Sequence, residues 1–304
     1  MEKITLGDVT LTLGFGKGEG GIDSWWKRLL SRVETPYLRS HLYGADAGRC
    51  ARLNFFHAYN ETVPAVQNSA STAYMAIGVA LENMLRDALQ RDNRLIASNY
   101  RIPQVEGIPI SGKVDLIAVD NSERVSIFEV KTCSALPKLP KWVHLQQLQT
   151  YAAVTGFDRA FLTYISRGVQ STYGGGLDIL TFQIDTSRSS LYDRLLTAAI
   201  SNLAIPSGFV PPMQPTFRKS VECLHCPFIP VCWEGAEYPL SEMAVTSTLY
   251  LELKTQAESL AETAWETRSD RFQGVLAELL SDFSSPATLP YLKTELKTAL
   301  GKTA

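Results

Sequence analysis

The stretches Gly112-Lys-Val-Asp-Leu-Ile-Ala-Val119 and Val125-Ser-Ile-Phe-Glu-Val-Lys131 decide the fold of this 304-residue chain. Both are apolar and β-branched, and a short polar turn separates them, so they predict two paired strands. Side chains alternate across a strand, so Glu129 and Lys131 lie on one face, next to a strand that carries Asp115. Charges inside such runs are costly to bury unless they are paired or bound to a metal.

Mg²⁺ prefers hard oxygen ligands and usually keeps several waters. Asp115 and Glu129 can supply carboxylates, and the Val130 carbonyl can add a backbone ligand. A bound ion would polarise a phosphate and lower the pKa of a water. Lys131 would then orient or deprotonate that water, or neutralise charge that develops at phosphorus. The alternative is an ordinary ion pair between Glu129 and Lys131 at a strand end, with Asp115 capping a turn.

Composition describes a soluble globular protein, because 45% of the residues are hydrophobic and 20% are charged. The formal net charge is only −2, so any nucleic-acid binding must come from a local basic patch. No long apolar run and no signal-peptide pattern are present. We therefore expect a cytoplasmic protein that does not bind a membrane.

Hydrophobic periodicity predicts an α/β core with an N-terminal arm and a helical C-terminal tail. The expected strands are a strand or hairpin over 3–15, then 108–119, 124–131, 159–166 and 177–184; the expected helices are 71–92, 141–155 (ended by Gly156), 189–204, most of 241–282 and a short last helix. A proline-rich linker is expected from Pro206 to Pro215.

Two of these helices carry polar residues with periodic spacing. His144, Gln147 and Tyr151 share one face of the helix over 141–155, which is either a solvated face or part of a site. Glu82 lies among apolar residues of the helix over 71–92, so its carboxylate is expected to point toward the core.

In this order, Glu82, Gly112-x-x-Asp115, Glu129-x-Lys131 and Gln147-x-x-x-Tyr151 resemble the motifs of the RecB-like branch of the PD-(D/E)xK nuclease superfamily. The resemblance implies a restriction-endonuclease-like core with a central mixed β-sheet flanked by helices. It implies metal ligands (Glu82, Asp115 and Glu129), a catalytic lysine (Lys131) and residues that position water or DNA (Gln147 and Tyr151). The first motif often carries His where this chain has Glu82.

Three cysteines form Cys223-x₂-Cys226-x₅-Cys232, and three thiolates need a fourth ligand to close a tetrahedral site. Cys50 and Cys133 are the candidates. Cys133 follows Lys131 by two residues and is interpreted as a buried thiol, so Cys50 is the better ligand. By ligand type, Zn²⁺ and an iron–sulfur cluster are both acceptable, with Zn²⁺ as the default.

An early cysteine before an aromatic-rich helix, followed by C-x₂-C-x₅-C after the core, resembles the iron–sulfur-containing RecB-like nucleases. These include the CRISPR-associated adaptation nucleases and the nuclease domain of AddB. The resemblance implies a structural [4Fe–4S] cluster on four cysteines (Cys50, Cys223, Cys226 and Cys232).

Residues 24–59 combine aromatic side chains with a local net charge of +4. Cations and aromatic faces together suit single-stranded nucleic acid. The alternative is a helical arm that packs its aromatic residues on the core and leaves its cations solvated.

We therefore expect a Mg²⁺- or Mn²⁺-dependent DNA nuclease, an exonuclease rather than an endonuclease, that acts on DNA ends or single strands. The expected settings are CRISPR adaptation, recombination or repair, and viral or mobile-element DNA, with a possible protein partner. The rival is a non-catalytic iron–sulfur or zinc protein that binds DNA or a partner. The expected organisation is an arm (1–69), the nuclease core (70–205), the cysteine segment (206–235) and a helical tail (236–304).

Overall fold

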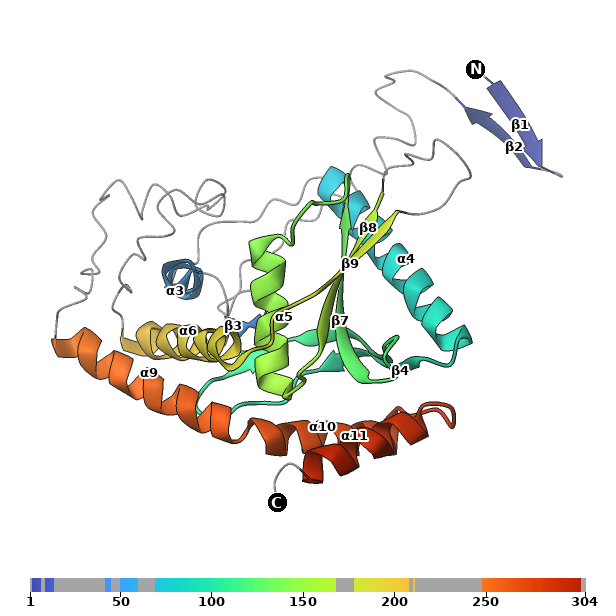
Figure 1. The fold of residues 1–304 in the computed structure, drawn as a ribbon. Helices are drawn as coiled ribbons and strands as arrows, with labels where there is room; N and C mark the ends of the chain where they lie inside the picture. Colours follow the sequence, from blue (N-terminus) through green and yellow to red (C-terminus); the bar gives the residue numbers. More distant parts are fainter. Residues whose placement is uncertain are drawn as a thin grey trace, which may run out of the picture. The chain divides into compact units, whose positions relative to one another are not determined.

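The computed structural model describes residues 2–6, 9–13, 42–44, 50–59, 69–167, 178–207, 210 and 248–301 (Figure 1). These residues fall into two compact units. The smaller contains the first residues of helix α4 and an antiparallel hairpin of β1 (Glu2–Leu6) and β2 (Val9–Leu13). This hairpin confirms one of the two interpretations of residues 3–15. All other described elements belong to the larger unit.

The larger unit is built on a five-stranded mixed sheet. Its strands, in spatial order, are β4 (Leu95–Arg101), β6 (Lys113–Val119), β7 (Val125–Cys133), β8 (Ala160–Ser166) and β9 (Ile179–Gln183). Only β7 and β8 are parallel; the other neighbours are antiparallel. The α/β class and the mixed sheet flanked by helices are confirmed.

Helix α5 (Trp142–Thr155) is the crossover between the parallel strands β7 and β8. Parallel neighbours need such a connection, and a helix that packs back on the sheet provides it. The helix ends at Gly156, whose φ of 87° is left-handed and suits glycine. The predicted end of this helix is therefore confirmed.

Helices cover both faces of the sheet. Helix α4 (Ser69–Arg91) packs one apolar row, which includes Leu81, Leu85 and Leu89, on a face that contains Val130. Helix α5 covers the other face, beside α6 (Arg188–Ser207) (Figure 1). The catalytic candidates of β7 alternate with Val130, so they face the α5 side.

The C-terminal helices are part of the main core. They are α9 (Thr248–Glu266), α10 (Arg268–Asp282) and α11 (Leu289–Gly301). Their buried residues Ala261, Leu276 and Leu292 belong to the same cluster as the sheet and α5. In the part of the chain that the structure describes, no helix has the length and apolar character needed to span a bilayer.

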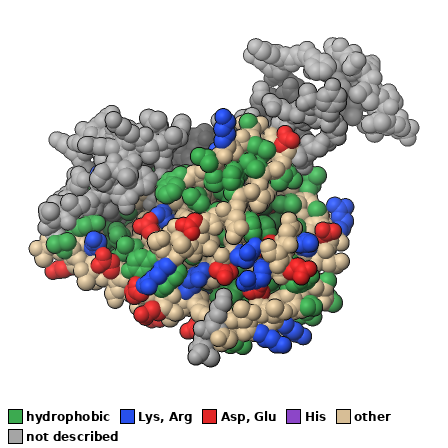
Figure 2. Space-filling model, viewed as in Figure 1, with side chains coloured by type: hydrophobic (Ala, Val, Ile, Leu, Met, Phe, Trp, Pro, Cys, Tyr) green, Lys and Arg blue, Asp and Glu red, His purple; other side chains and the backbone are tan. Residues whose placement is uncertain are grey.

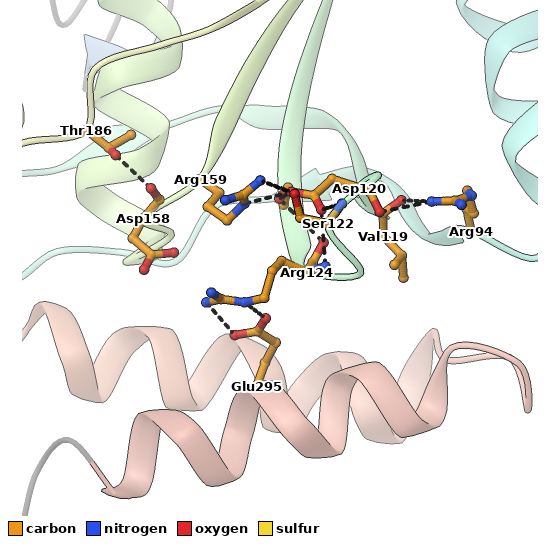
Figure 3. A network of polar contacts seen from close by, with 10 residues as sticks. Arg94, Val119, Asp120, Ser122, Arg124, Asp158, Arg159, Thr186 and Glu295 are labelled. Carbon is orange, nitrogen blue, oxygen red and sulfur yellow. Dashed lines mark hydrogen bonds and ion pairs between the residues drawn. The ribbon is translucent and has the colours of Figure 1, made fainter.

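A polar network joins these helices to the β6–β7 turn (Figure 3). Asp120 is buried and accepts hydrogen bonds from the side chains of Arg159 (2.6 Å) and Ser126 (2.9 Å). Arg124 forms an ion pair with Glu295 of α11. The hairpin that carries Asp115, Glu129 and Lys131 is thus held at its turn end by the tail.

Three details differ from the sequence predictions. Strand β4 was not predicted. The expected strand over 108–119 is interrupted at Gly112, giving a short β5 (Ile110–Ser111) that pairs with β3 (Leu42–Tyr43). The linker was expected to begin at Pro206, but α6 includes that residue. The aromatic-rich helix expected after Cys50 is present as α3 (Ala51–Tyr59).

Candidate active site

Asp115, Glu129 and Lys131 converge where β6 and β7 separate. The last registered pair of these strands is Leu116 with Phe128, and Asp115 and Glu129 are the next residues on each strand. The backbone N–H of Val130 donates to Asp115 Oδ2 at 2.7 Å. Lys131 Nζ donates to Glu129 Oε1 at 2.5 Å. The predicted grouping of two carboxylates and one lysine is therefore present.

The electrostatics of this group favour an additional cation. Burial raises the pKa of Glu129 to about 8; Lys131 opposes this shift and Asp115 adds to it. Burial also raises the pKa of Asp115 despite the nearby Lys131. The carboxylates outweigh burial at Lys131 and raise its pKa, so the ammonium stays charged. One ammonium does not compensate both buried carboxylates.

One carboxylate oxygen of Glu129 is available to bind a cation. Glu129 is 1% exposed, and its Oε2 is buried without an N–H or hydroxyl donor, although the Asp115 carboxyl is close enough to share a proton with the Glu129 carboxyl. Such an atom is costly unless it is bound to a cation. Beside Asp115, it fits a hard divalent ion such as Mg²⁺ or Mn²⁺. The Glu129–Lys131 ion pair exists, but it occupies only Oε1, so it does not account for the whole carboxylate.

Glu82 approaches this group from α4, on the other side of the sheet. Gly78, one turn earlier, lies close to β7: a Cβ atom there would be 3.3 Å from Thr132 Oγ1. Burial and the charge of Asp115 raise the pKa of Glu82, while Lys131 lowers it. Within the described ranges, no group of three or more His, Cys, Asp and Glu side chains has metal-binding geometry. Direct ligation by Glu82 stays a prediction.

Gln147 and Tyr151 lie on α5 above the same face. Gln147 Nε2 donates to Tyr151 Oη at 3.2 Å, and the phenol is almost fully buried. The Tyr151 ring lies against two glycines: a Cβ atom would be 2.1 Å from Cε1 at Gly44 and 2.8 Å from it at Gly112. Gly112 of the Gly112-x-x-Asp115 motif thus makes room for Tyr151, and Gly44 is a site residue that the sequence analysis missed.

His144 is a second residue that joins the site. Its Nδ1 lies 3.0 Å from Tyr164 Oη, and the Lys141 backbone N–H donates to the same hydroxyl at 2.9 Å. Tyr164 is fully buried, so its proton needs an acceptor, and the N–H cannot provide one. Nδ1 therefore accepts it and Nε2 carries the imidazole proton. Tyr164 pairs in register with Lys131.

The state of His144 follows from its surroundings. Burial, Lys131 and Lys141 lower the pKa of His144 to about 4. The imidazole is therefore neutral at pH 7 and offers an N–H donor at the edge of the site. The shared helix face of His144, Gln147 and Tyr151 was the signal in the sequence.

Comparison with known proteins identifies the family. A family model described as "PD-(D/E)XK nuclease superfamily" matches residues 40–233. The chain belongs to the PD-(D/E)XK nuclease superfamily. Glu129-Val130-Lys131 fits the D/E-x-K pattern of that name. A solved structure described as "Crystal structure of SSO0001" is 19% identical, with a TM-score of 0.43, and the match covers 70% of this chain and 96% of that one. No curated protein matches the chain.

The predicted cluster cysteines are only partly described in this PD-(D/E)XK chain. Cys223, Cys226 and Cys232 lie outside the described residues. Cys50 is half-buried and packs on an apolar cluster that includes residues of α3 and α6. Cys133 is buried, and its Sγ lies 3.7 Å from the Ile165 carbonyl oxygen, as expected for a structural thiol.

The described part of the basic, aromatic arm packs into the core. Phe55 and Phe56 of α3 are 0% and 2% exposed and pack with Leu253 of α9. Arg52 is also buried, and its guanidinium lies 6.0 Å from the Phe56 ring centroid. The suggestion that these side chains contact DNA is wrong, because packing removes them from solvent. The remaining aromatic and basic residues of 24–41, 45–49 and the side chain of Tyr59 lie outside the described set.

Proposed function

We propose that the chain is a Mg²⁺- or Mn²⁺-dependent deoxyribonuclease of the RecB-like type that hydrolyses phosphodiester bonds at DNA ends or in single strands. One observation carries the proposal: Glu129 Oε2 is buried without an N–H or hydroxyl donor and adjoins the Asp115 carboxylate, while Lys131 occupies Oε1. Asp115 and Glu129 would hold a divalent ion next to the Lys131 ammonium, and the two cations together would stabilise the charge that develops during phosphate hydrolysis.

Each side chain has a proposed role. Asp115 and Glu129 would hold the ion, and Glu82 would assist, through a water if its carboxylate does not reach the ion. A bound ion supplies polarisation of the scissile phosphate and a water of lowered pKa. Lys131 would orient that water or neutralise the charge that develops on the phosphate. Gln147 and Tyr151 would position the water or the DNA strand.

We further propose that Cys50, Cys223, Cys226 and Cys232 bind a structural [4Fe–4S] cluster. The cysteine segment lies between Val210 and helix α9, and both of these flanking parts contact the apolar cluster that contains Cys50: Val210 directly, and α9 through Tyr250 and Leu253. The family match, residues 40–233, also spans all four cysteines. Such a cluster would join distant parts of the chain and stabilise the fold.

The proposed setting is DNA-end processing in the cytoplasm, by exonuclease action. The proposed settings are CRISPR adaptation, recombination or repair, and viral or mobile-element replication, with a protein partner in a recombination or CRISPR integration complex. The protein should degrade linear single-stranded DNA and leave circular single-stranded DNA of the same sequence intact. Equal cleavage of both would establish an endonuclease instead.

The central test is DNA degradation with Mg²⁺, with Mn²⁺ and with a chelator. Lys131→Ala should lose activity by roughly 10²-fold or more, since a group aimed at developing charge contributes on this scale. The matched control is Lys254→Ala: Lys254 is half-exposed on α9 and makes only a 3.7 Å surface pair with Glu258. Equal cleavage by wild type and Lys131→Ala would rule out this mechanism, and no metal-dependent cleavage by either would support the non-catalytic DNA-binding alternative.

The cluster is tested separately on anaerobically purified protein. Iron and acid-labile sulfide with a brown colour are expected, and Cys50→Ser should lose both. Cys133→Ser is the matched control and should keep both the iron and the sulfide, because the Cys133 thiol is hydrogen-bonded to the Ile165 carbonyl inside the core. A colourless protein containing zinc would refute the iron–sulfur assignment.

A further inference from the structure

An apolar and basic segment lies directly after the strand that carries Glu129 and Lys131. Leu139 is 76% exposed and Trp142 is 54% exposed, although both are large hydrophobic side chains. Between and beside them, Lys138 and Lys141 are also exposed. Leaving this much apolar surface in water is unfavourable and marks a binding surface.

The segment is attached to the catalytic group. The Lys141 backbone N–H donates to Tyr164 Oη at 2.9 Å, and Tyr164 pairs in register with Lys131 of the neighbouring strand. Trp142 is the next residue and the first of α5. The exposed side chains are therefore continuous with the site proposed to cut the phosphodiester.

A buried arginine supports the half-exposed Trp142 ring. The Arg194 guanidinium carbon lies 5.8 Å from the ring centroid, and Arg194 forms an ion pair with Asp193. Arg194 is itself buried, so it provides a fixed support for the ring. A pre-positioned aromatic ring with an exposed surface binds a flat partner at a small entropic cost.

The positive charge beside Trp142 favours an anionic partner. Burial lowers the pKa of His144, and the charges of Lys131 and Lys141 lower it further; burial raises the pKa of Cys133, and the charges of Lys141 and Arg167 oppose that rise. Lys138 and Lys141 thus provide exposed positive charge beside Trp142, while Lys131 is paired with Glu129 and Asp193 with Arg194. On the face seen in Figure 2, by contrast, acidic and basic side chains alternate over the C-terminal helices.

We propose that residues 138–142 form a base-stacking platform for an unpaired DNA nucleotide, with Trp142 stacking on the base and Lys138 and Lys141 contacting phosphates. Aromatic faces combined with cations are what single-stranded nucleic acid binds. Leu139 would cover the edge of the stacked base. This inference rests on the proposed nuclease function and deepens it, because it assigns single-stranded DNA as the strand led to Lys131.

The test is fluorescence anisotropy of a labelled single-stranded oligonucleotide in chelator, so that no cleavage occurs. Trp142→Ala should weaken binding by about 5- to 100-fold, the scale of one aromatic stack, and Trp142→Phe should weaken it less. Lys138→Ala should reduce the salt dependence by about one counterion. Leu251→Ala is the matched control: Leu251 is 51% exposed on α9 and should have no effect.

Oligonucleotide binding should also quench tryptophan fluorescence, and Trp142→Phe should remove that change. Wild-type affinity in Trp142→Ala, or an unchanged quench in Trp142→Phe, would overturn the platform. The nuclease proposal is read separately, from cleavage by the wild type with metal. If the wild type cuts but Trp142 is irrelevant to binding, only the platform fails. If Trp142 governs binding but no metal supports cutting, only the nuclease proposal fails.

Discussion

The ring of Tyr151 lies against the backbone of Gly112, where a Cβ atom would come within 2.8 Å of ring carbon Cε1. Tyr151 belongs to α5, and Gly112 immediately precedes β6, which carries Asp115. The contact therefore sets the distance between the two elements that form the candidate active site.

Gly112→Ala should displace Tyr151 and reduce cleavage by roughly 10- to 100-fold, because small shifts of positioning groups have effects of this size. Overpacking should also lower the free energy of unfolding by about 1–3 kcal/mol. Steady-state cleavage and denaturant unfolding measure the two effects. Gly274→Ala on α10 is the control: its Cβ would meet nothing within 4 Å, so activity should be unchanged. Full activity of Gly112→Ala would contradict the packing argument.

Glu129→Gln should show two effects of the buried Glu129 carboxylate: it lowers the stability of the fold, and it is needed to bind the metal ion. At pH 7 without metal, the variant should be more stable than the wild type, with a free energy of unfolding higher by on the order of 1 kcal/mol. The reason is that burial raises the pKa of Glu129 to about 8, so the fold disfavours the ionised carboxylate that is stable in the unfolded chain. The stabilisation of the wild type by Mn²⁺ should be absent in the variant. Thermal unfolding with and without Mn²⁺ measures both. An equal Mn²⁺-dependent increase in Tm for the two proteins would remove Glu129 from the metal site.

Asp120 should make stability depend on pH in the acid range. Burial alone would raise its pKa, but hydrogen bonds from Arg124, Ser126, Arg159 and Ser122 outweigh burial and lower it. A depressed carboxyl pKa stabilises the fold above the unfolded-state pKa, and this stabilisation is lost as pH falls through the folded-state pKa.

Asp120→Asn should therefore cost about 2–4 kcal/mol at pH 7, because an amide in place of Oδ2 leaves the Arg159 guanidinium and the Ser126 hydroxyl without their acceptor. The difference from the wild type should shrink below about pH 4, where the wild-type carboxyl protonates as well. Denaturant unfolding at a series of pH values gives the comparison. A difference that stays constant from pH 7 to the acid range would show that the charge of Asp120 is not the cause.

Arg271 should hold α10 to the end of α5. Its guanidinium donates to the carbonyls of Val154 (2.8 Å), Ala153 (3.2 Å) and Ala264 (2.6 Å). These bonds satisfy carbonyls that a helix end leaves open and place a cation at its negative end. Arg271→Ala should lower the free energy of unfolding by about 2–4 kcal/mol, measured by denaturant titration.

The control for this change is Arg188→Ala, which removes an exposed pair with Glu262 and should cost less than about 1 kcal/mol. Similar small losses for both arginines would show that the carbonyl contacts of Arg271 are not essential for attaching the tail.

His144→Ala should reduce cleavage by about 10- to 100-fold with little change in DNA affinity, because it removes an N–H donor beside Lys131. His144→Gln keeps an acceptor for the Tyr164 hydroxyl and should be as stable as the wild type. Kinetic constants and thermal unfolding of both variants provide the comparison. Unchanged kcat in the alanine variant would leave His144 as a packing residue.

Much of the sheet and site could be predicted because the signals are local. Strand alternation placed Glu129 and Lys131 on one face, and the left-handed Gly156 ended α5 where expected. Strand β4 was missed because Leu95–Arg101 mixes polar and apolar residues without clear alternation. Phe55 and Phe56 looked like a nucleic-acid surface because composition alone does not distinguish an exposed ring from a buried one.

By itself, the sequence determined the chemistry of the site: two carboxylates and a lysine on adjacent strands, in the order typical of a nuclease. Only the tertiary structure decided what supports it. Tyr151 fits between two glycines from other elements, and Arg271 binds a helix end 117 residues away in the chain. Such contacts join segments that are far apart in the sequence, and neither local sequence predicts the other segment. The packing of the whole core therefore decides them.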